Sequence, residues 1–232
     1  MGAEPGPAGP IELSAAGGAL QLSFELPSGA AERPAEPLDL ASAPGATADL
    51  RVAWQQAAGA RVELACVRAS SDRWVAGLET AVLDGASATV RKLGGLDALA
   101  PEAPTAVGPA LQQDFTGRSD GAPGSAVVHG RHLLGVAGPR PDVVLCTLAC
   151  FDEVPGEPNG GGDEASGTPS GPCPGVAGSF SAQGYVAAPP PGLLARAADW
   201  TMAHPRAAAA GALVLMLLAV ALLLRFRPRP AY

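Results

Sequence analysis

The cysteines and histidines are the residues of this chain that could bind a metal or take part in redox or acid–base chemistry. Cys146 and Cys150 are four residues apart in VVLCTLACF, a segment rich in β-formers. In a strand their Cα atoms would lie about 13 Å apart, too far for a disulfide between them or for one zinc ion to join both. His129 and His132 are three residues apart in a predicted strand, so they are expected on opposite faces of a sheet. The sequence therefore predicts neither a metal site nor a cofactor site.

The cysteines have two possible states, which depend on where the domain lies. Cys66 and Cys146 are expected to be small core residues rather than ligands, because both sit in apolar, strand-like segments. Cys173 is different, because it lies in the open sequence Gly-Pro-Cys-Pro-Gly. If the domain were outside the cytoplasm, a disulfide between Cys150 and Cys173 could fasten this loop to the sheet, whereas a cytoplasmic location would keep both thiols reduced.

A cluster of charged residues and a histidine is the part of the chain that could carry catalysis. Loops around residues 114–131 could assemble a hydrolase or transferase site, because carboxylates, guanidinium groups and an imidazole occur together there. A solvated strand edge would carry the same charges, and the sequence has no Gly-x-x-x-x-Gly-Lys phosphate loop and no His-Glu-x-x-His pair. We therefore favour a non-catalytic protein and keep an enzyme as the alternative. The residues of that alternative are Asp114, Arg118, Asp120, His129 and Arg131.

The distribution of charge makes nucleic acid an unsuitable partner. Residues 1–205 contain all 22 acidic residues and only 11 of the 15 basic ones, which gives this part a net charge of -11. A surface with that charge repels a phosphate backbone. The remaining four basic residues are Arg206, Arg225, Arg227 and Arg229.

The C-terminal part carries the most specific pattern in the chain. From Ala207 to Leu224 there are 18 uncharged, apolar residues in a row. As a helix this segment would be about 27 Å long, close to the thickness of the hydrocarbon layer of a bilayer. Arginines flank it on both sides, where lipid headgroups would lie. The sequence thus predicts a single transmembrane helix, which makes the lipid bilayer a partner.

The side of the membrane on which the rest of the chain lies is predicted less directly. The first ten residues, MGAEPGPAGP, have no basic region, apolar run or cleavage site of a signal peptide. The simplest expectation is a tail-anchored protein whose domain is in the cytoplasm. The positive-inside rule favours the extracytoplasmic alternative by one charge, because three arginines follow the span and two precede it within about 20 residues.

Hydrophobic periodicity predicts an α+β domain, with a mostly antiparallel sheet packed against one long helix. Apolar residues at steps of three and four from about Asp72 to Leu93 indicate the helix, which Gly94 and Gly95 would end. The turns between the later segments are too short for parallel crossovers. Strands are expected at 20–26, 50–54, 61–68, 112–116, 126–136 and 143–151, the second and third as a hairpin.

Composition divides the chain into six parts. The predicted globular domain covers residues 11–151, and the Gly/Pro-rich acidic segment 152–192 is predicted to be a disordered linker. The other parts are a disordered tail at 1–10, a juxtamembrane helix at 193–204, the transmembrane helix at 207–224 and a short basic tail at 225–232.

The order of predicted elements over residues 11–151 resembles that of Mog1/PsbP-like α/β sandwich proteins. The resemblance lies in the opening LSFELPSG (residues 22–29), followed by two strands and a helix, and no diagnostic motif accompanies it. It implies a helix inserted into a largely antiparallel sheet, and a binding or accessory module without a shared active site. We therefore predict a membrane-anchored, non-catalytic binding or accessory module that acts with a protein partner at the membrane.

Overall fold

The computed structural model describes residues 10–35, 45–56, 59–70, 78–119, 126–138, 142–153 and 171–187. All of these residues belong to one structural unit, Met1–Pro189. Within them the chain forms two sheets, two α-helices and one short 3-10 helix.

The larger sheet has eight strands, each antiparallel to its neighbours. Their order is β3-β4-β5-β10-β9-β8-β6, and β7 pairs with β8. The long strands β8, β9 and β10 follow one another along the chain and form a meander, as the short predicted turns require. The strands are β3 (Ala30–Arg33), β4 (Thr47–Gln56), β5 (Arg61–Ser70), β6 (Ala98–Pro101), β7 (Thr105–Val107), β8 (Ala110–Ser119), β9 (Ala126–Ala137) and β10 (Asp142–Glu153).

The smaller sheet combines the two ends of the described chain. Its order is β1-β2-β11, and both pairings are antiparallel. A 3-10 helix, η1 (Ala16–Gly18), connects the first two strands. The strands are β1 (Pro10–Ala15), β2 (Leu20–Glu25) and β11 (Ser181–Gln183), and the last of these follows helix α2 (Cys173–Ser179) directly.

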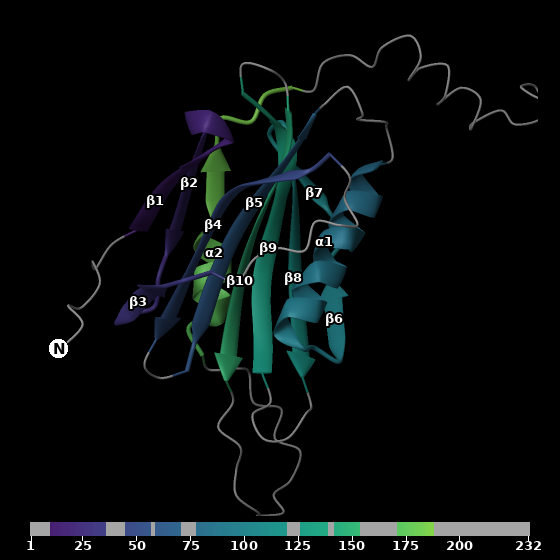
Figure 1. The fold of residues 1–232 in the computed structure, drawn as a ribbon. Helices are drawn as coiled ribbons and strands as arrows, with labels where there is room; N and C mark the ends of the chain where they lie inside the picture. The colour runs from purple at the N-terminus through teal and green to yellow at the C-terminus, as the bar shows by residue number, and fades with distance from the viewer. Residues whose placement is uncertain are drawn as a thin grey trace, which may run out of the picture. The chain divides into compact units, whose positions relative to one another are not determined.

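The elements form three layers (Figure 1). The smaller sheet and α2 lie on one face of the larger sheet, and helix α1 (Leu78–Gly94) lies on the other, over β8, β9 and β10. Each layer contributes an apolar face, so the larger sheet is covered on both sides in its central part.

Strand β10 lies at the centre of the larger sheet and is buried on both faces. Its residues Val144, Cys146, Leu148 and Cys150 point into the core between the two sheets. The alternate residues point to the side of α1, where Phe151 packs in a second apolar cluster. A strand covered on both faces needs apolar residues at nearly every position, which explains the continuous run VVLCTLACF.

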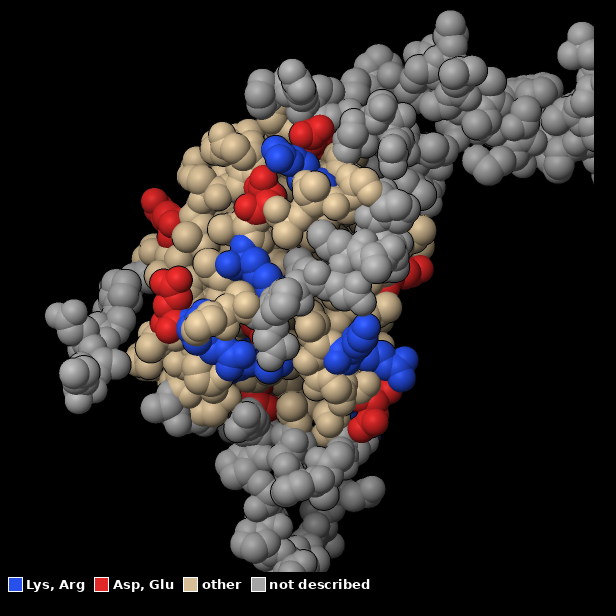
Figure 2. All heavy atoms as spheres, viewed as in Figure 1, with Lys and Arg blue, Asp and Glu red and all other residues tan. Residues whose placement is uncertain are grey.

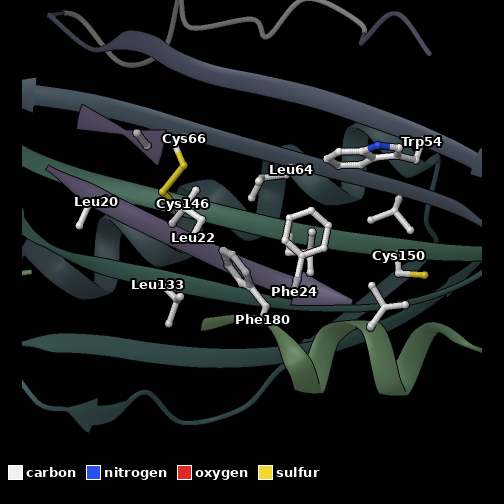
Figure 3. Close-up of a cluster of buried hydrophobic side chains, with 14 of the residues drawn as sticks. Leu20, Leu22, Phe24, Trp54, Leu64, Cys66, Leu133, Cys146, Cys150 and Phe180 are labelled. Carbon is white, nitrogen blue, oxygen red and sulfur yellow. A yellow bond between two sulfur atoms is a disulfide. The ribbon is translucent and has the colours of Figure 1, made fainter. Parts of the chain in front are cut away.

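Aromatic rings fill the core between the two sheets (Figure 3). The Phe24 ring of β2 lies 5.3 Å from the Trp54 ring of β4 and 6.2 Å from the Phe180 ring that follows α2, both edge to face. Edge-to-face contacts of this kind stabilise a core beyond the burial of area alone. Phe180 therefore ties the C-terminal part of the described chain into the main core.

The sheet-rich α+β fold expected from the sequence is confirmed. Predicted strand 20–26 corresponds to β2, the hairpin to β4 and β5, and the three later segments to β8, β9 and β10. The predicted helix corresponds to α1 from Leu78 onward, and its first residues, 72–77, lie outside the described part. The helix ends at Gly94, where a side chain would come within 2.6 Å of the Phe151 ring.

Two boundaries of the predicted domain need correction. The segment 152–192, predicted as a linker, contains the end of β10, all of α2 and β11, and an isolated bridge from Val186 to Val136 of β9. Its few apolar residues were too sparse to suggest order, but Val176, Ala177 and Phe180 are buried against the sheet. At the other end, β1 begins at Pro10, within the predicted tail.

Within the part of the chain that the structure describes, neither helix combines the length and the apolar character needed to cross a membrane. The predicted anchor from Ala207 to Leu224, the helix at 193–204 and the tail at 225–232 lie outside that part.

Candidate functional site

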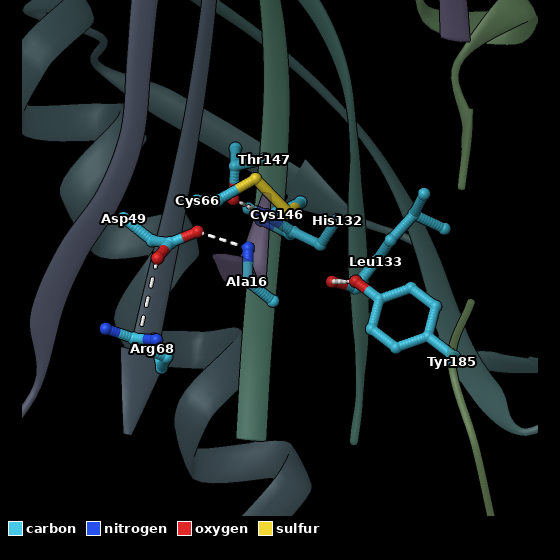
Figure 4. The surroundings of a disulfide bond; sticks show 9 residues. All are labelled: Ala16, Asp49, Cys66, Arg68, His132, Leu133, Cys146, Thr147 and Tyr185. Atoms are coloured by element: carbon cyan, nitrogen blue, oxygen red, sulfur yellow. Dashed lines mark hydrogen bonds and ion pairs between the residues drawn. A yellow bond between two sulfur atoms is a disulfide. The ribbon is translucent and has the colours of Figure 1, made fainter. Parts of the chain in front are cut away.

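All four cysteines are joined in two disulfides and are buried. The first joins Cys66 of β5 to Cys146 of β10 (Figure 4). Both are core residues, as predicted, but the bond between them was not part of that prediction. The antiparallel register puts them directly opposite each other. That pairing of residues 80 positions apart is not visible in local sequence patterns.

The second disulfide joins Cys150 of β10 to Cys173 at the start of α2. This is the bond that the sequence allowed for an extracytoplasmic domain. Both cysteines are fully buried, at 0% exposure. A thiol locked in a buried disulfide is neither a nucleophile nor a metal ligand, so the cysteines of this chain hold the fold together.

The predicted charged cluster is only partly assembled. The Arg131 guanidinium on β9 binds the carboxylate of Asp114 on β8 through two hydrogen bonds, of 2.6 and 2.9 Å. Its remaining terminal nitrogen donates to the carbonyl oxygens of Gly178 and Phe180, at 3.2 and 3.0 Å. Arg131 thus satisfies the free carbonyls at the end of α2 and joins α2 to the larger sheet.

Of the other described members of that cluster, Arg118 lies apart from this pair, and His129 lies two residues from Arg131 on the same face of β9. Arg118 is four residues further along β8, so at strand spacing its Cα is roughly 13 Å from that of Asp114. His129 is opposite Cys150 on β10, where burial lowers the pKa of its imidazole and the nearby Asp152 carboxylate partly offsets this. Asp120 lies outside the described residues. The structure therefore brings together Asp114 and Arg131, and assigns them a structural contact.

Asp152 is a half-buried carboxylate beside the second disulfide. Burial raises its pKa, and a hydrogen bond from the backbone N–H of Cys173 and the proximity of His129 act in the opposite direction. Its side chain also packs against the backbone at Gly171, where a β-carbon would overlap the carboxylate. Asp152 thus fixes the entry into α2.

The buried His132, for which the sequence predicted a strand position but no partner, forms an enclosed polar network. The Nε2 atom of His132 on β9 is 3.2 Å from the Ser87 hydroxyl on α1, and its Nδ1 atom is 2.8 Å from the Thr147 hydroxyl on β10. The Phe115 ring lies 4.5 Å from the imidazole. Sequence reasoning could place Ser87 and His132 on elements, but the packing of α1 on the sheet brings them together.

The order serine, histidine, threonine is similar to that of a catalytic triad, but its chemistry differs. Burial lowers the pKa of His132 to about 3, so the ring is neutral and a poor proton acceptor. In triads a carboxylate stabilises the imidazolium, and here a neutral hydroxyl occupies that position. The network is therefore suited to holding α1 on the sheet and not to activating the Ser87 hydroxyl.

Contrary to the expectation that the chain has no Gly-x-Ser-x-Gly pattern, residues 117–121 read GRSDG. In lipases and esterases this pattern forms a sharp turn between a strand and a helix. Here Gly117, Arg118 and Ser119 lie within β8 and pair with β9, the next strand of the meander. Gly117 is explained by packing, because a β-carbon there would lie 2.7 Å from the carbonyl oxygen of Ala98.

A hollow of about 600 Å³ lies beside this network, between α1 and β6, and we call it the α1–β6 hollow. It is an open depression at the surface of the domain and not an enclosed cavity. The Ser87 hydroxyl network lies next to it, and the remaining lining is partly apolar and partly charged. The lining residues are Asp84, Ser87, Ala88, Arg91, Lys92, Gly95, Leu96, Leu99 and Pro101.

Arg91 is the best-defined cation in the hollow. Its Nε atom donates to the carbonyl oxygen of Leu96 at 3.2 Å, which holds the guanidinium at the end of α1. The terminal nitrogens of an arginine fixed in this way can still bind an anion. Basic and acidic side chains both occur on the face drawn in Figure 2.

Comparison with known proteins does not place the chain in a family: no family model matches it, and no curated relative is found. Among the described residues, no group of three or more histidine, cysteine or acidic side chains could hold a metal ion. The candidate site is therefore defined by geometry alone, as the α1–β6 hollow on a disulfide-bonded scaffold.

Proposed function

We propose that this chain is a single-pass membrane protein whose disulfide-bonded domain is a non-catalytic binding or accessory module on the extracytoplasmic side. The observation that carries the proposal is the pairing of all four cysteines in two buried disulfides. Disulfides persist in oxidising compartments and are rare in the cytosol. This favours the alternative placement over the cytoplasmic one that the N-terminal residues suggested.

The charge around the predicted anchor is consistent with this orientation. With the domain outside, Arg225, Arg227 and Arg229 would follow the span on the cytoplasmic side, as the positive-inside rule prefers. The anchor from Ala207 to Leu224 would keep the domain at the membrane surface. Confinement there raises the effective concentration of the domain toward a membrane partner.

A binding function, and not catalysis, is supported by what the polar side chains already do. Arg131 and Asp114 join α2 to the sheet, and His132 joins α1 to the sheet as a neutral ring. Asp114 and Arg131 are held in their mutual contact, and the neutral His132 ring is a poor proton acceptor at neutral pH. The resemblance to Mog1/PsbP-like proteins implies the same class of binding or accessory module.

The test is the redox state of the cysteines in living cells that express the full chain. Cells are quenched in acid, and the chain is denatured and treated with a maleimide coupled to polyethylene glycol, with and without prior reduction. We expect no adduct without reduction and four after it. Four adducts without reduction would refute the extracytoplasmic placement.

A matched variant checks that the assay counts thiols correctly. Cys150→Ser removes one partner of the second disulfide and should give one adduct without reduction, on Cys173. Digestion of sealed spheroplasts by an added protease then reports on topology independently. Protection of the domain from the protease would also count against the proposal.

A further inference from the structure

We propose that the α1–β6 hollow binds a single-chain anionic amphiphile of the fatty-acid type. This inference rests on the proposed function, because it names the ligand of the binding module. It starts from the mixed lining of the hollow, in which Leu96, Leu99 and Pro101 are apolar and Arg91 and Lys92 are cationic. An acyl chain with a carboxylate at one end matches both parts of that lining.

The apolar part of the hollow is provided by the turn after α1 and by β6. Leu96 is buried and Leu99 is half-buried, and both belong to the apolar cluster that includes Phe115 and Phe151. A bound alkyl chain would extend this cluster outward and remove further apolar surface from water. The cluster thus supplies an apolar wall for a ligand, mainly through the half-buried Leu99.

The charged part of the hollow favours an anion. Arg91 and Lys92 occupy the last turn of α1, and one acidic residue, Asp84, lies about two turns earlier on the same helix. The Arg91 guanidinium is exposed, oriented by the Leu96 carbonyl, and makes no ion pair with a carboxylate within the part of the chain that the structure describes. The terminal nitrogens of Arg91 can therefore donate two hydrogen bonds to a ligand carboxylate in a bidentate contact.

The membrane location selects a lipid-like ligand over a soluble anion. A domain held at a bilayer surface by the predicted anchor would meet single-chain lipids at high local concentration. A small soluble anion would use only the cations and leave the wall formed by Leu96 and Leu99 unfilled. A ligand that contacts both the cationic and the apolar residues of the hollow must be an amphiphile.

The test uses the full chain in nanodiscs of phosphatidylcholine and a palmitate that carries a photoreactive diazirine. After irradiation, the labelled peptides are identified by mass spectrometry. We expect labelling concentrated in residues 84–101 and competed by unlabelled palmitate, but not by hexadecylamine, which carries the opposite charge. Labelling spread evenly over the domain would overturn the proposal.

Matched variants separate the charge from the apolar wall. Arg91→Gln should lower labelling of the hollow by up to about fivefold, the fold-change that corresponds to an exposed ion pair of about 1 kcal/mol. Arg68→Gln is the control, because the Arg68 side chain is 41% exposed but pairs with Asp49 and Asp142 and does not line the hollow. Leu99→Asp should abolish labelling, and Asp84→Asn should raise it. Equal labelling of the Arg91 and Arg68 variants would refute the assignment.

These results are independent of the thiol assay. A chain with four reduced cysteines that still labels at the hollow would refute the extracytoplasmic placement and leave the ligand assignment standing. A chain with two disulfides and no specific labelling would refute the ligand assignment alone.

Discussion

The disulfide between Cys150 and Cys173 should contribute a large share of the stability of the domain. It joins the central strand β10 to the start of α2 and closes a loop of 23 residues. In the chain-entropy description, closing a loop of this length restricts the unfolded state by about 3.4 kcal/mol. A domain of ordinary stability has about 5 to 15 kcal/mol in total, so the loss would be clearly measurable.

The perturbation is the paired variant Cys150→Ala/Cys173→Ala, which removes the bond without placing unpaired hydroxyls in the core. The full chain is unfolded with guanidinium in a non-denaturing detergent and followed by far-ultraviolet circular dichroism. We expect the free energy of unfolding to fall by about 3.4 kcal/mol. The amides of α2 and β11 should also exchange with deuterium much faster, because the bond no longer holds this segment on the sheet.

The first disulfide provides the comparison. The pair Cys66→Ala/Cys146→Ala opens a loop of 80 residues, for which the same description gives about 4.5 kcal/mol. It should leave exchange in α2 close to that of the wild type, since β5 and β10 remain paired along their length. A loss below about 1 kcal/mol for the Cys150 and Cys173 pair, with unchanged exchange in α2, would refute the reasoning.

Three further perturbations test other parts of the structure. Arg131→Gln removes the contacts to Asp114 and to the carbonyl oxygens of Gly178 and Phe180. Guanidinium unfolding should then show a free energy of unfolding lower by about 2 kcal/mol. A change near zero would show that other contacts hold α2. His132 has a pKa near 3 in the folded state against 6.5 for the free side chain, so the unfolded state binds a proton first as the pH falls. As the pH is lowered from 6.5 to 3, the free energy of unfolding of the wild type should therefore fall more steeply than that of His132→Gln, by about 1.4 kcal/mol per pH unit. Parallel pH profiles of the two proteins would contradict this. Gly130→Ala places a β-carbon against the Phe115 ring and should cost about 2 kcal/mol in thermal or chemical unfolding. The control Gly85→Ala has open space within α1 and should stabilise by up to about 1 kcal/mol; equal effects of the two would contradict the packing argument.

Local sequence patterns identified the elements whose own residues have a regular spacing of apolar side chains. The alternation from Leu20 to Glu25 and the three- and four-residue steps up to Leu93 depend on neighbours along the chain, and both were confirmed. The short strands β3, β6 and β7 have three or four residues each, too few for a period to be recognised.

Features that depend on contacts between distant residues were missed. The Cys66 and Cys146 bond requires the register of β5 against β10, and the order of α2 requires Arg131, Cys150 and the core around Phe180. The segment that contains α2 is rich in glycine and proline, so composition alone suggested disorder. The candidate site combines the turn after α1 with β6, and its contacts likewise become visible only in three dimensions.

The position of Cys173 has a mechanical consequence for a chain held by its C-terminus. A pull on the chain beyond residue 187 would reach Val186 first, then Tyr185, whose hydroxyl donates a hydrogen bond to the carbonyl oxygen of Leu133, and then β11. The peeling would stop at Cys173, where the load passes covalently to β10 in the middle of the larger sheet. The 14 residues from 174 to 187 could thus extend by up to about 50 Å while the core stays folded.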